Sequence, residues 1–470
     1  MVDAMDRYLD EALAQYAGQD VYPFHMPGHK RRIRVAGMDA SMDITEIDGF
    51  DNLHAPEGII AGAMERAAVL YGAGRSFVLV NGSTVGMLAA VFACVPEGGE
   101  ILIQRGAHRS VYNAAMLRHL STVYVENSTL DCGLKGNLST EDVDNLLKTH
   151  PNIRAVVITS PSYDGIVDNV DKISDIVHAH GARLIVDEAH GAHFGFHTDF
   201  PQTAVRLGAD MVVQSLHKTL PAFTQTALLH VNDPALFDGA AEYLRIFETS
   251  SPSYPMMAGA DACMRLMKEE GEVLLDSLRD HLDYFYDRTK SLRNLRVFDG
   301  RGRADIFGWD ISRISILGGG YVTGTEICDT LRSRYSIELE MGDLIHGLAI
   351  ATVADERAGF ERLADALADI DAGLSDEGRG AGFAVNVAAP PELPAGAMSL
   401  FEAHEAEAEE VSPEEAAGRI SAGFICAYPP GSPIVAPGER ITHGIMEHIE
   451  ALRAAQVRIT GMDGSVRVVK

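Results

Sequence analysis

The sequence contains no uncharged apolar run approaching the roughly 18 residues of a membrane-spanning helix, so we expect no membrane span. Its N-terminus lacks a basic start followed by an apolar core, and we therefore expect no secretory signal peptide. Cysteine is scarce, and the five cysteines include no CxxC pair, which argues against a disulfide framework or a zinc knuckle. This usage suits a reducing compartment, so we expect a cytoplasmic protein.

Positive charge is also in short supply. The 39 basic residues are outnumbered by 67 acidic ones, and the resulting net charge of −28 would repel a nucleic-acid backbone. This matters because residues 187–190 spell DEAH, the letters of a helicase motif. Such an ATPase also needs the phosphate-binding pattern GxxxxGKS or GxxxxGKT, which the sequence does not contain. We therefore expect no nucleic-acid partner and no helicase activity.

Three histidines close to the same acidic pair suggest a metal site as a second possibility. His190, His193 and His197 lie in the stretch EAHGAHFGFH. Its glycines and phenylalanines favour a loop that leaves a strand end, where three imidazoles need not converge. Loop histidines more commonly bind backbone or carboxylate groups, so we expect no metal ion here.

From about residue 75 short apolar strands alternate with helical segments, a pattern typical of βαβ units around a mainly parallel sheet. A helical segment at 202–208 is expected between the strands LIVD (184–187) and VVQSLHK (212–218). Ligands of such sheets bind just beyond the carboxyl ends of the strands. Those ends carry candidate groups at residues 81–84, 106–108, Asp187 and Lys218.

After about residue 290 the pattern changes to that of a smaller α+β unit. Strand-like stretches such as HGLAIATVA (346–354) alternate with amphipathic helices such as GTEICDTLRSRYSI (324–337). We therefore expect three parts: an N-terminal arm at 1–50, a large domain with the candidate groups at 51–290, and a C-terminal small domain at 291–470.

Asp187 and Lys218 together favour a third chemistry. Each closes a short apolar strand, so in a doubly wound sheet both side chains would face the same crevice. A buried lysine amine with a lowered pKa is a Schiff-base nucleophile, and a carboxylate can keep a pyridinium nitrogen protonated. These are the requirements of pyridoxal 5'-phosphate (PLP), whose protonated ring accepts the electrons of a carbanion at the substrate's α-carbon.

The phosphate of such a cofactor needs an anchor, and the stretch VNGSTVGML (80–88) supplies one. It places an Asn-Gly turn and the hydroxyls of Ser83 and Thr84 at the start of a helix, whose free N–H groups favour an anion. Ser215 and His217, beside the lysine, are further candidate donors. A Ser-Thr pair before a helix is usually only an N-cap, so the specificity comes from the combination.

The motifs around these residues resemble the Orn/Lys/Arg decarboxylases, a family of fold type I PLP-dependent enzymes, over nearly the whole chain. The resemblance implies an aspartate aminotransferase-like α/β fold, with a mainly parallel sheet in the PLP-binding large domain and a smaller α+β C-terminal domain. The stretches that carry it are PFHMPGHK (23–30), DNLHAPEGII (51–60), FVLVNGSTVG (77–86), HRSVYNA (108–114), ITSPSYDGIV (158–167), LIVDEAHGAHFGFH (184–197), ADMVVQSLHKTLPAFTQTALLH (209–230) and YPPGSPIVAPGE (428–439).

The resemblance implies a role for each candidate residue. Lys218 would form the Schiff base with PLP, Asp187 would bind the pyridinium nitrogen, and His108 would stack on the ring. The residues that would hold the phosphate are Ser83, Thr84, Ser215 and His217. Thr249, in ETSSPSYP, matches a position that reaches the phosphate of the neighbouring subunit, which implies a homodimer or a dimer-based oligomer with shared active sites.

The implied reaction is the decarboxylation of a basic L-amino acid to CO₂ and a polyamine-pathway amine. The PLP-domain motifs begin almost at once, so the chain resembles the short family members without an N-terminal wing domain. Short members resemble biosynthetic arginine decarboxylases, which makes arginine the first candidate substrate, followed by lysine and ornithine. Ala427 and Ser432 stand where the family often has proline and a larger apolar residue, so the C-terminal domain matches less closely.

Several substrate contacts and two other functions stay open. Glu439 is a candidate partner for the substrate's distal cation, and a carboxylate in solvent is the alternative. His25 and His29 are candidates either to approach the partner's active site or to pin the N-terminal arm. An aminotransferase on the same fold would use a small-domain arginine, Arg419 or Arg440, to bind the α-carboxylate. A PLP-binding homologue without catalytic activity is the other alternative.

Overall fold

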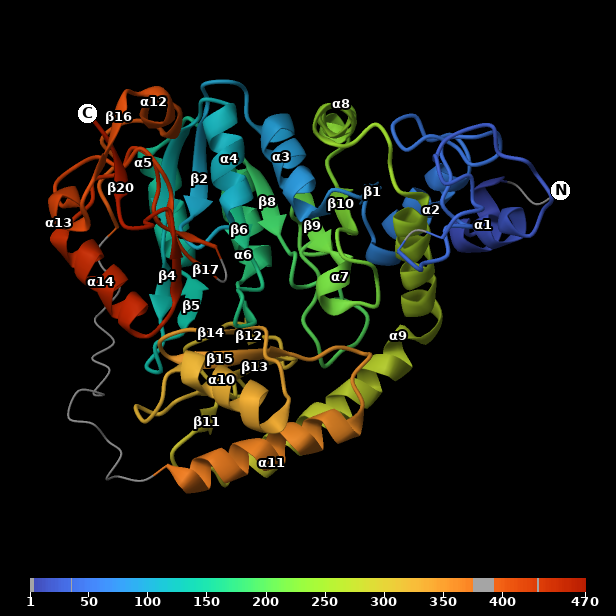
Figure 1. The fold of residues 1–470 in the computed structure, drawn as a ribbon. Coiled ribbons are helices and arrows are strands. Elements are labelled where there is room, and N and C mark those ends of the chain that lie inside the picture. Colours follow the sequence, from blue (N-terminus) through green and yellow to red (C-terminus); the bar gives the residue numbers. More distant parts are fainter. Residues whose placement is uncertain (1–3, 35, 375–392, 429–430) are drawn as a thin grey trace. The chain divides into compact units, whose positions relative to one another are not determined.

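The fold is that of a computed structural model describing residues 4–34, 36–374, 393–428 and 431–470 (Figure 1). The chain divides into two units, each made of two stretches of sequence. Unit 1 comprises Met1–Cys94 and Val170–Leu275, and unit 2 comprises Val95–Asn169 and Asp276–Lys470. The division into an arm and two domains that the sequence suggests stays a prediction.

Unit 1 contains four strands of the central sheet, in the order β1, β10, β9, β8, together with the helices of this part of the chain. Its elements are η1 Ala4–Asp6, α1 Leu9–Ala17, α2 Ile59–Tyr71, β1 Arg75–Leu79, α3 Gly82–Cys94, α6 Val170–Ala179, β8 Arg183–Asp187, β9 Met211–Ser215, α7 Leu216–Thr219, β10 Ala227–Val231, η2 Pro234–Leu236, α8 Phe237–Phe247 and the first part of α9 Tyr254–Thr289.

The strand directions of unit 1 bring several strand ends to one edge of the sheet. β8 and β9 are parallel, whereas β10 runs antiparallel to both β9 and β1. The carboxyl ends of β1, β8 and β9 therefore lie at the same edge. In the register, Ala227 pairs with both Leu79 and Ser215, and Asp187 pairs with Val213. This edge carries the candidate groups of unit 1.

Helix α3 starts at that edge and packs closely on the strands. Its residues are mostly apolar, and a Cβ atom at Gly86 would lie only 2.8 Å from Leu79 Cδ1 and 3.0 Å from Val213 Cγ1. A side chain at Gly86 would push the helix away from the sheet. Because glycine stands there, the first turn of α3, with Ser83 and Thr84, stays close to β1 and β9.

The helical segment predicted at 202–208 is wrong, because these residues form turns. The carboxylate of Glu188 accepts hydrogen bonds from the Thr203 hydroxyl and the Ala204 N–H, both at 2.7 Å. These bonds hold the start of the segment against the end of β8. Beyond it the Arg206 N–H donates to the Thr203 carbonyl at 3.0 Å and the Leu207 N–H to the Ala204 carbonyl at 3.2 Å, which are turn bonds, and Gly208, with φ +88°, ends the segment.

The prediction that Lys218 closes a strand is also wrong in detail. Strand β9 ends at Ser215, and Lys218 lies on the one-turn helix α7 that follows directly. This turn is closed by the hydrogen bond from the Leu220 N–H to the Leu216 carbonyl, at 2.9 Å. The lysine therefore stands just beyond the strand end, as ligand chemistry in such sheets requires.

Unit 2 contains three parallel strands, in the order β6, β2, β3, together with a smaller α+β part. Its elements are β2 Glu100–Gln104, α4 Arg109–Leu117, β3 Ser121–Val125, β4 Asn127–Thr129, β5 Lys135–Leu138, α5 Thr140–Thr149, β6 Ile153–Thr159, β7 Ile166–Val167, the last part of α9, β11 Arg296–Val297, β12 Gly308–Trp309, β13 Arg313–Leu317, α10 Gly324–Tyr335, β14 Met341–Gly342, β15 His346–Ile350, α11 Arg357–Gly373, α12 Leu400–Glu405, β16 Ala408–Val411, α13 Pro413–Ala416, β17 Ile425–Tyr428, β18 Pro433–Val435, α14 His443–Ala454, β19 Arg458–Thr460 and β20 Val466–Val469.

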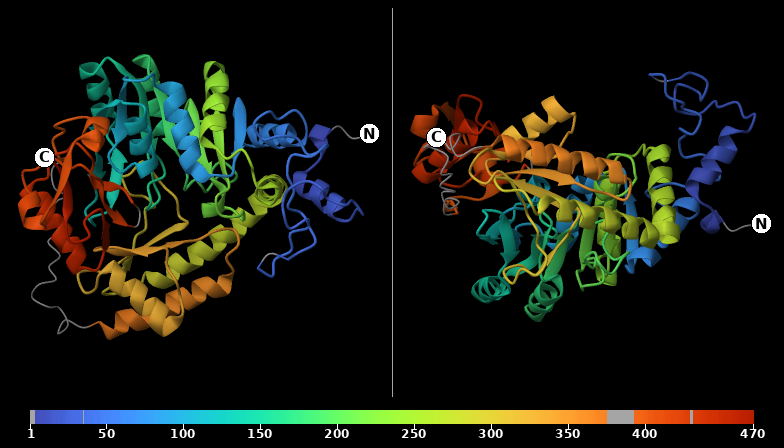
Figure 2. Two further views of the ribbon diagram at one scale, coloured as in Figure 1. Left: turned by 45° about the horizontal axis from the view of Figure 1, so that its top comes forward. Right: turned by 90° about the horizontal axis from the view of Figure 1, so that it is seen from below.

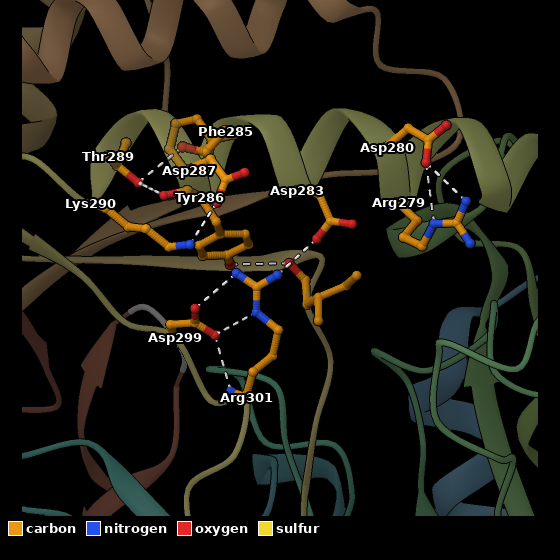
Figure 3. A network of polar contacts seen from close by, with 11 residues as sticks. Arg279, Asp280, Asp283, Phe285, Tyr286, Asp287, Thr289, Lys290, Asp299 and Arg301 are labelled. Carbon is orange, nitrogen blue, oxygen red and sulfur yellow. Dashed lines mark hydrogen bonds and ion pairs between the residues drawn. The ribbon is translucent and has the colours of Figure 1, made fainter.

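The strand predicted at 346–354 is confirmed as β15, and the helix predicted at 324–337 is confirmed as α10. Figures 1 and 2 show α11 beside the last part of α9, where Phe285 and Phe360 pack with ring centroids 6.3 Å apart. On another side of α9, Arg301 joins Asp283 and Asp299 at 2.8 Å each (Figure 3). Among the described residues, no helix combines the length and apolar character that a membrane span requires.

Candidate active site

Asp187 is the last residue of β8 and is buried, with 4% of its surface exposed. Its Oδ1 accepts a hydrogen bond from the Ala189 N–H at 3.1 Å. The backbone beyond it stays extended for one more residue, because the Glu188 N–H donates to the Val213 carbonyl of β9 at 2.9 Å. The carboxylate is therefore fixed in direction by a strand end and by the turn that follows.

Lys218 approaches this turn from α7. Its Nζ lies 3.1 Å from Nε2 of His190, which is 7% exposed. The DEAH stretch (187–190) and Lys218 thus lie close together, as the sequence predicts for two parts of one site. From the sequence, His190 is considered only as a metal ligand, and its contact with the lysine amine is a finding of the structure. The signal in the sequence was its place three residues after Asp187.

The candidate phosphate groups lie at the carboxyl ends of β1 and β9. Ser83 and Thr84 occupy the first turn of α3, which is anchored by the Gly82 N–H donating to the Gln225 carbonyl at 2.9 Å. Ser215 closes β9. Its Oγ is buried and has no hydrogen-bond partner among the described residues, and the same holds for Oγ1 of Thr219. A buried hydroxyl without a partner is costly unless a ligand supplies one.

His217 lies on α7, between Ser215 and Thr219 in the sequence. Its Nδ1 donates to the Thr226 carbonyl at 3.0 Å, since a carbonyl can only accept. Burial lowers the pKa of His217, and the neighbouring charge of Lys218 acts in the same direction. The free imidazole is therefore held neutral, with the proton on Nδ1.

Thr249 is tied by its backbone to two other segments of unit 1. Its N–H donates to Oδ1 of Asn81 at 3.1 Å, next to the start of α3. Its carbonyl accepts a hydrogen bond from Nε2 of His54 at 2.8 Å, and its Oγ1 accepts the Ser251 N–H at 3.1 Å.

The two histidines of the arm make contacts within the arm. His25 Nε2 lies 3.3 Å from the Tyr16 hydroxyl. Nδ1 of His29 accepts the Arg31 N–H at 3.0 Å, which leaves its Nε2 to donate to Asp43 at 3.1 Å. These contacts fit the alternative in which the histidines pin the arm, and an approach to a partner's active site stays a prediction.

His108 belongs to unit 2 and caps the N-terminus of α4. Its Nδ1 accepts the Ser110 N–H at 3.2 Å, so a neutral His108 carries its proton on Nε2. The cap fixes the direction of an exposed imidazole at the carboxyl end of β2. Stacking of this ring on a cofactor stays a prediction.

Glu439, also in unit 2, is buried and fully engaged. Its two oxygens accept from Nη1 and Nη2 of Arg105, at 2.5 and 2.9 Å, and Oε2 also accepts the Ala436 N–H at 2.7 Å. With 3% of its surface exposed, the alternative of a carboxylate in solvent is wrong. A role in binding the substrate's distal cation stays a prediction, and it would compete with Arg105 for the same oxygens.

The two arginines considered for an aminotransferase are engaged locally. Arg419 pairs with Glu409 at 2.6 Å and also donates to the Val469 carbonyl at 2.9 Å. Arg440 donates to the Gly418 carbonyl at 2.6 Å. The described residues contain no group of three or more His, Cys, Asp or Glu side chains that could hold a metal ion, and the prediction that histidines 190, 193 and 197 bind none stays a prediction.

Comparison with known protein families decides the identity of the chain. Residues 8–306 match the major domain of the Orn/Lys/Arg decarboxylases, and residues 387–469 match their C-terminal domain. The chain belongs to the Orn/Lys/Arg decarboxylase family. This confirms the resemblance on which the site roles depend, and it makes the chain a PLP-dependent amino-acid decarboxylase by class.

Individual relatives of this decarboxylase agree with that assignment. The arginine decarboxylase of Bacillus subtilis is 29% identical over 97% of this chain and 96% of its own length. The structure of the Escherichia coli constitutive lysine decarboxylase superposes with a TM-score of 0.87 at 20% identity, over 98% of this chain and 82% of that one. The pyridoxamine-pyruvate aminotransferase of Mesorhizobium loti gives a TM-score of 0.53 at 16% identity, over 67% and 83%. The predicted α/β fold of type I PLP-dependent enzymes, with a mixed and mostly parallel sheet, is confirmed.

Proposed function

We propose that this decarboxylase converts a basic L-amino acid to CO₂ and the corresponding polyamine-pathway amine, with arginine as its substrate ahead of lysine and ornithine. The family supports a basic amino acid, and the order of substrates rests on the arginine decarboxylase of Bacillus subtilis, matched over nearly its full length. The observation that carries the proposal is the contact between Lys218 Nζ and His190 at the strand edge that Asp187 and Ser215 close.

The residues of this edge fit PLP. The hydroxyls of Ser215 and Thr219, which have no partner among the described residues, can donate to an acceptor, and the phosphate oxygens supply one. Ser83 and Thr84 add the first turn of α3, whose N–H groups favour an anion. When bound, PLP supplies a protonated ring that accepts the electron pair left on the substrate's α-carbon when the carboxylate departs as CO₂.

The chain's own residues would divide the remaining work. Lys218 would hold the cofactor covalently until the substrate amine takes its place, and its released Nζ would be a proton donor to the α-carbon. His190, 3.1 Å from that Nζ, is placed to hold or return this proton. The buried carboxylate of Asp187 would keep the ring nitrogen protonated, because its negative charge favours the cation. His108 would cover one face of the ring, and His217 would hold the phosphate.

We also propose a homodimer with shared active sites. Its support is the resemblance of Thr249, in ETSSPSYP, to a family position that reaches the phosphate of the neighbouring subunit. In the proposed dimer the Thr249 hydroxyl reaches the phosphate of the neighbouring subunit. A cytoplasmic location is part of the same proposal and rests on the cysteine usage alone.

The test is to incubate the purified protein with PLP and, separately, with arginine, lysine and ornithine, and to measure CO₂ and the amine. We expect CO₂ and agmatine from arginine at the highest kcat/KM. If CO₂ is released from lysine or ornithine but not from arginine, the order of substrates is wrong and the proposed reaction stands. The absence of CO₂ from all three, with a 2-oxo acid formed when an acceptor is added, would replace decarboxylation by transamination.

The matched control is Lys218→Ala. This variant should lose the borohydride-reducible bond to PLP and all CO₂ release, since no other group of the proposal supplies the amine. A Lys218→Ala protein with the same reducible bond as the wild type would refute the assignment of Lys218.

A further inference from the structure

Glu188, the residue after Asp187, is the centre of a buried hydrogen-bond network that the proposed reaction does not use. Its carboxylate accepts from the Thr203 hydroxyl at 2.7 Å, the Ala204 N–H at 2.7 Å and the Gln214 side-chain amide at 2.6 Å. Only 1% of its surface is exposed. A buried carboxylate is costly without hydrogen-bond donors, and here three donors surround it.

The network continues across two more strands of the sheet. Gln214 turns its amide nitrogen to the carboxylate, so its oxygen faces Nε2 of His230, 3.0 Å away. That oxygen can only accept, which puts the His230 proton on Nε2 and leaves Nδ1 to accept from the Ser76 hydroxyl at 2.7 Å. Burial lowers the pKa of His230 to about 3, and the imidazole is therefore neutral in this chain of bonds.

This network and the candidate cofactor groups lie on opposite faces of the same two strand ends. Glu188 follows Asp187, and Gln214 precedes Ser215. Because neighbouring residues of an extended strand point to opposite faces, the contact between Glu188 and Gln214 on one face puts Asp187 and Ser215 on the other. The 2.6 Å bond therefore joins the ends of β8 and β9 directly behind the two cofactor groups.

The turn after Glu188 depends on the same side chain. The Gly191 N–H donates to the Glu188 carbonyl at 2.9 Å, which closes the turn that carries His190. A Cβ atom at Gly191 would lie 2.7 Å from Cγ of Glu188 and 2.8 Å from the ring of Phe194. The Glu188 side chain thus fills the space inside the turn and supports the contact of His190 with the lysine.

We infer that Glu188 and Gln214, backed by His230, are positioning residues that set the spacing of Asp187 and Ser215 and the direction of His190. They touch neither cofactor nor substrate and act through the strand ends. This inference rests on the proposed function only for the identity of the ligand, which we take to be PLP.

The test compares PLP affinity in the wild type with that in Glu188→Gln. The variant keeps the shape of the side chain, but an N–H₂ group replaces one of its two acceptor oxygens. At the place of Oε2 this group faces the Gln214 amide, a second donor, so the bond between the strand ends is lost. We expect PLP to bind roughly 10-fold more weakly, the loss of one hydrogen bond to a charged group. We also expect the pH at which the visible band of the Lys218–PLP bond changes to shift, because the Asp187 carboxylate and the lysine lose their relative placement.

The double variant Glu188→Gln with Gln214→Glu provides the rescue. The exchange reverses donor and acceptor, so the 188 amide donates to the 214 carboxylate, which still accepts from His230. We expect this swap to regain most of the lost PLP affinity and the original pH dependence of the visible band. If Glu188→Gln does not fold, Gln214→Met removes the link between the strands together with the acceptor of His230, and it should weaken PLP binding in the same direction.

Asp371→Asn is the matched control. Asp371 is also a buried carboxylate held by N–H donors, from residues 293–295, and lies outside the strand ends. The Asp371→Asn variant should lose stability without a change in its PLP affinity or in its visible spectrum. Equal PLP affinity in the wild type and Glu188→Gln, or a swap no better than the single variant, would overturn the inference. A wild type that binds PLP without releasing CO₂ would overturn the proposed function alone, and one that binds no PLP would overturn both.

Discussion

The side-chain amide of Gln214 donates to the carboxylate of Glu188 at 2.6 Å, and this bond joins two neighbouring strand ends behind the candidate cofactor groups. Both residues are almost fully buried, at 0% and 1% exposed. A hydrogen bond to a carboxylate is stronger in such surroundings than in water, and breaking it leaves buried groups unpaired. The strand ends are therefore held together by polar contacts as well as by the sheet itself.

Glu188 makes the stability of the protein depend on pH in an unusual direction. Burial raises the pKa of Glu188 from 4.5 to about 7, against the effect of its three donors. Between these pH values the folded state binds a proton that the unfolded chain has lost, so the contribution of Glu188 to stability falls as pH rises. The advantage of the wild type over Glu188→Gln should thus shrink by about 3 kcal/mol from pH 4.5 to 7. Urea unfolding of both proteins across this range measures it, and a difference that grows with pH would contradict it.

Gly191 should not tolerate even a methyl group. Its Cβ would lie within 2.7 Å of the Glu188 side chain and 2.8 Å of the Phe194 ring, and both are enclosed by the fold. We expect Gly191→Ala to lower the free energy of unfolding by about 1–3 kcal/mol, the usual cost of overpacking. Thermal and urea unfolding measure the effect.

The control for this substitution is Gly359→Ala in helix α11. No atom lies within 4 Å of a Cβ at Gly359, so the methyl group meets open space. It should stabilise the protein by about 0.5 kcal/mol, since alanine loses less backbone entropy than glycine in a helix. If Gly191→Ala and Gly359→Ala change the free energy of unfolding equally, the space inside the turn at Gly191 is less tight than in the structure.

Part of the site could be predicted because it depends on short, local stretches of sequence. Asp187 ends a short run of branched apolar residues, and the run at 212–213 starts the next strand, although that strand ends at Ser215 and not at Lys218 as predicted; such runs are buried strands whose carboxyl ends gather at one edge. Lys218, a few residues after the second run, joined Asp187 on chemical grounds, and the resemblance to the family then gave each residue its role. The helix predicted at 202–208 is wrong because the segment closes as turns and ends at Gly208, with φ +88°, while its start is held by Glu188, a contact that no local pattern contains.

Other parts of the site depend on pairs that are distant in the sequence. Glu188 looks like an ordinary acidic neighbour of Asp187 until its partners at 203 and 214 are known. Glu439 meets Arg105 across 334 positions, and without that pairing its carboxylate is equally well read as a substrate ligand. Spacing and composition carry no information on such contacts, because the fold alone brings the partners together.

Glu439→Gln should reduce stability more than substrate binding. The substitution weakens a pair in which Arg105, 10% exposed, has its charge balanced by this carboxylate. Removing one partner of a buried ion pair costs about 3–5 kcal/mol, because the other charge stays buried. Urea unfolding should show this loss, and the double variant Arg105→Met with Glu439→Met should recover most of it. A raised KM for arginine without a loss of stability would instead support the distal-cation role of Glu439.

His217 should make PLP affinity depend on pH. Its Nδ1 proton is committed to the Thr226 carbonyl, so the neutral ring presents a bare Nε2 that cannot donate to a phosphate. Burial and the nearby Lys218 lower the pKa of His217 in the free protein, and a bound phosphate dianion would raise it again. Binding therefore takes up a proton, and affinity should fall by up to about tenfold per pH unit as pH rises between the two pKa values.

Glutamine at position 217 keeps a donor near the place of Nε2 without titrating, so His217→Gln should bind PLP with a flatter pH profile. Affinities from PLP titrations across this range compare the two proteins, and the changes common to both, including the titration of the phosphate itself, cancel. Identical pH profiles would show that His217 does not donate to the phosphate.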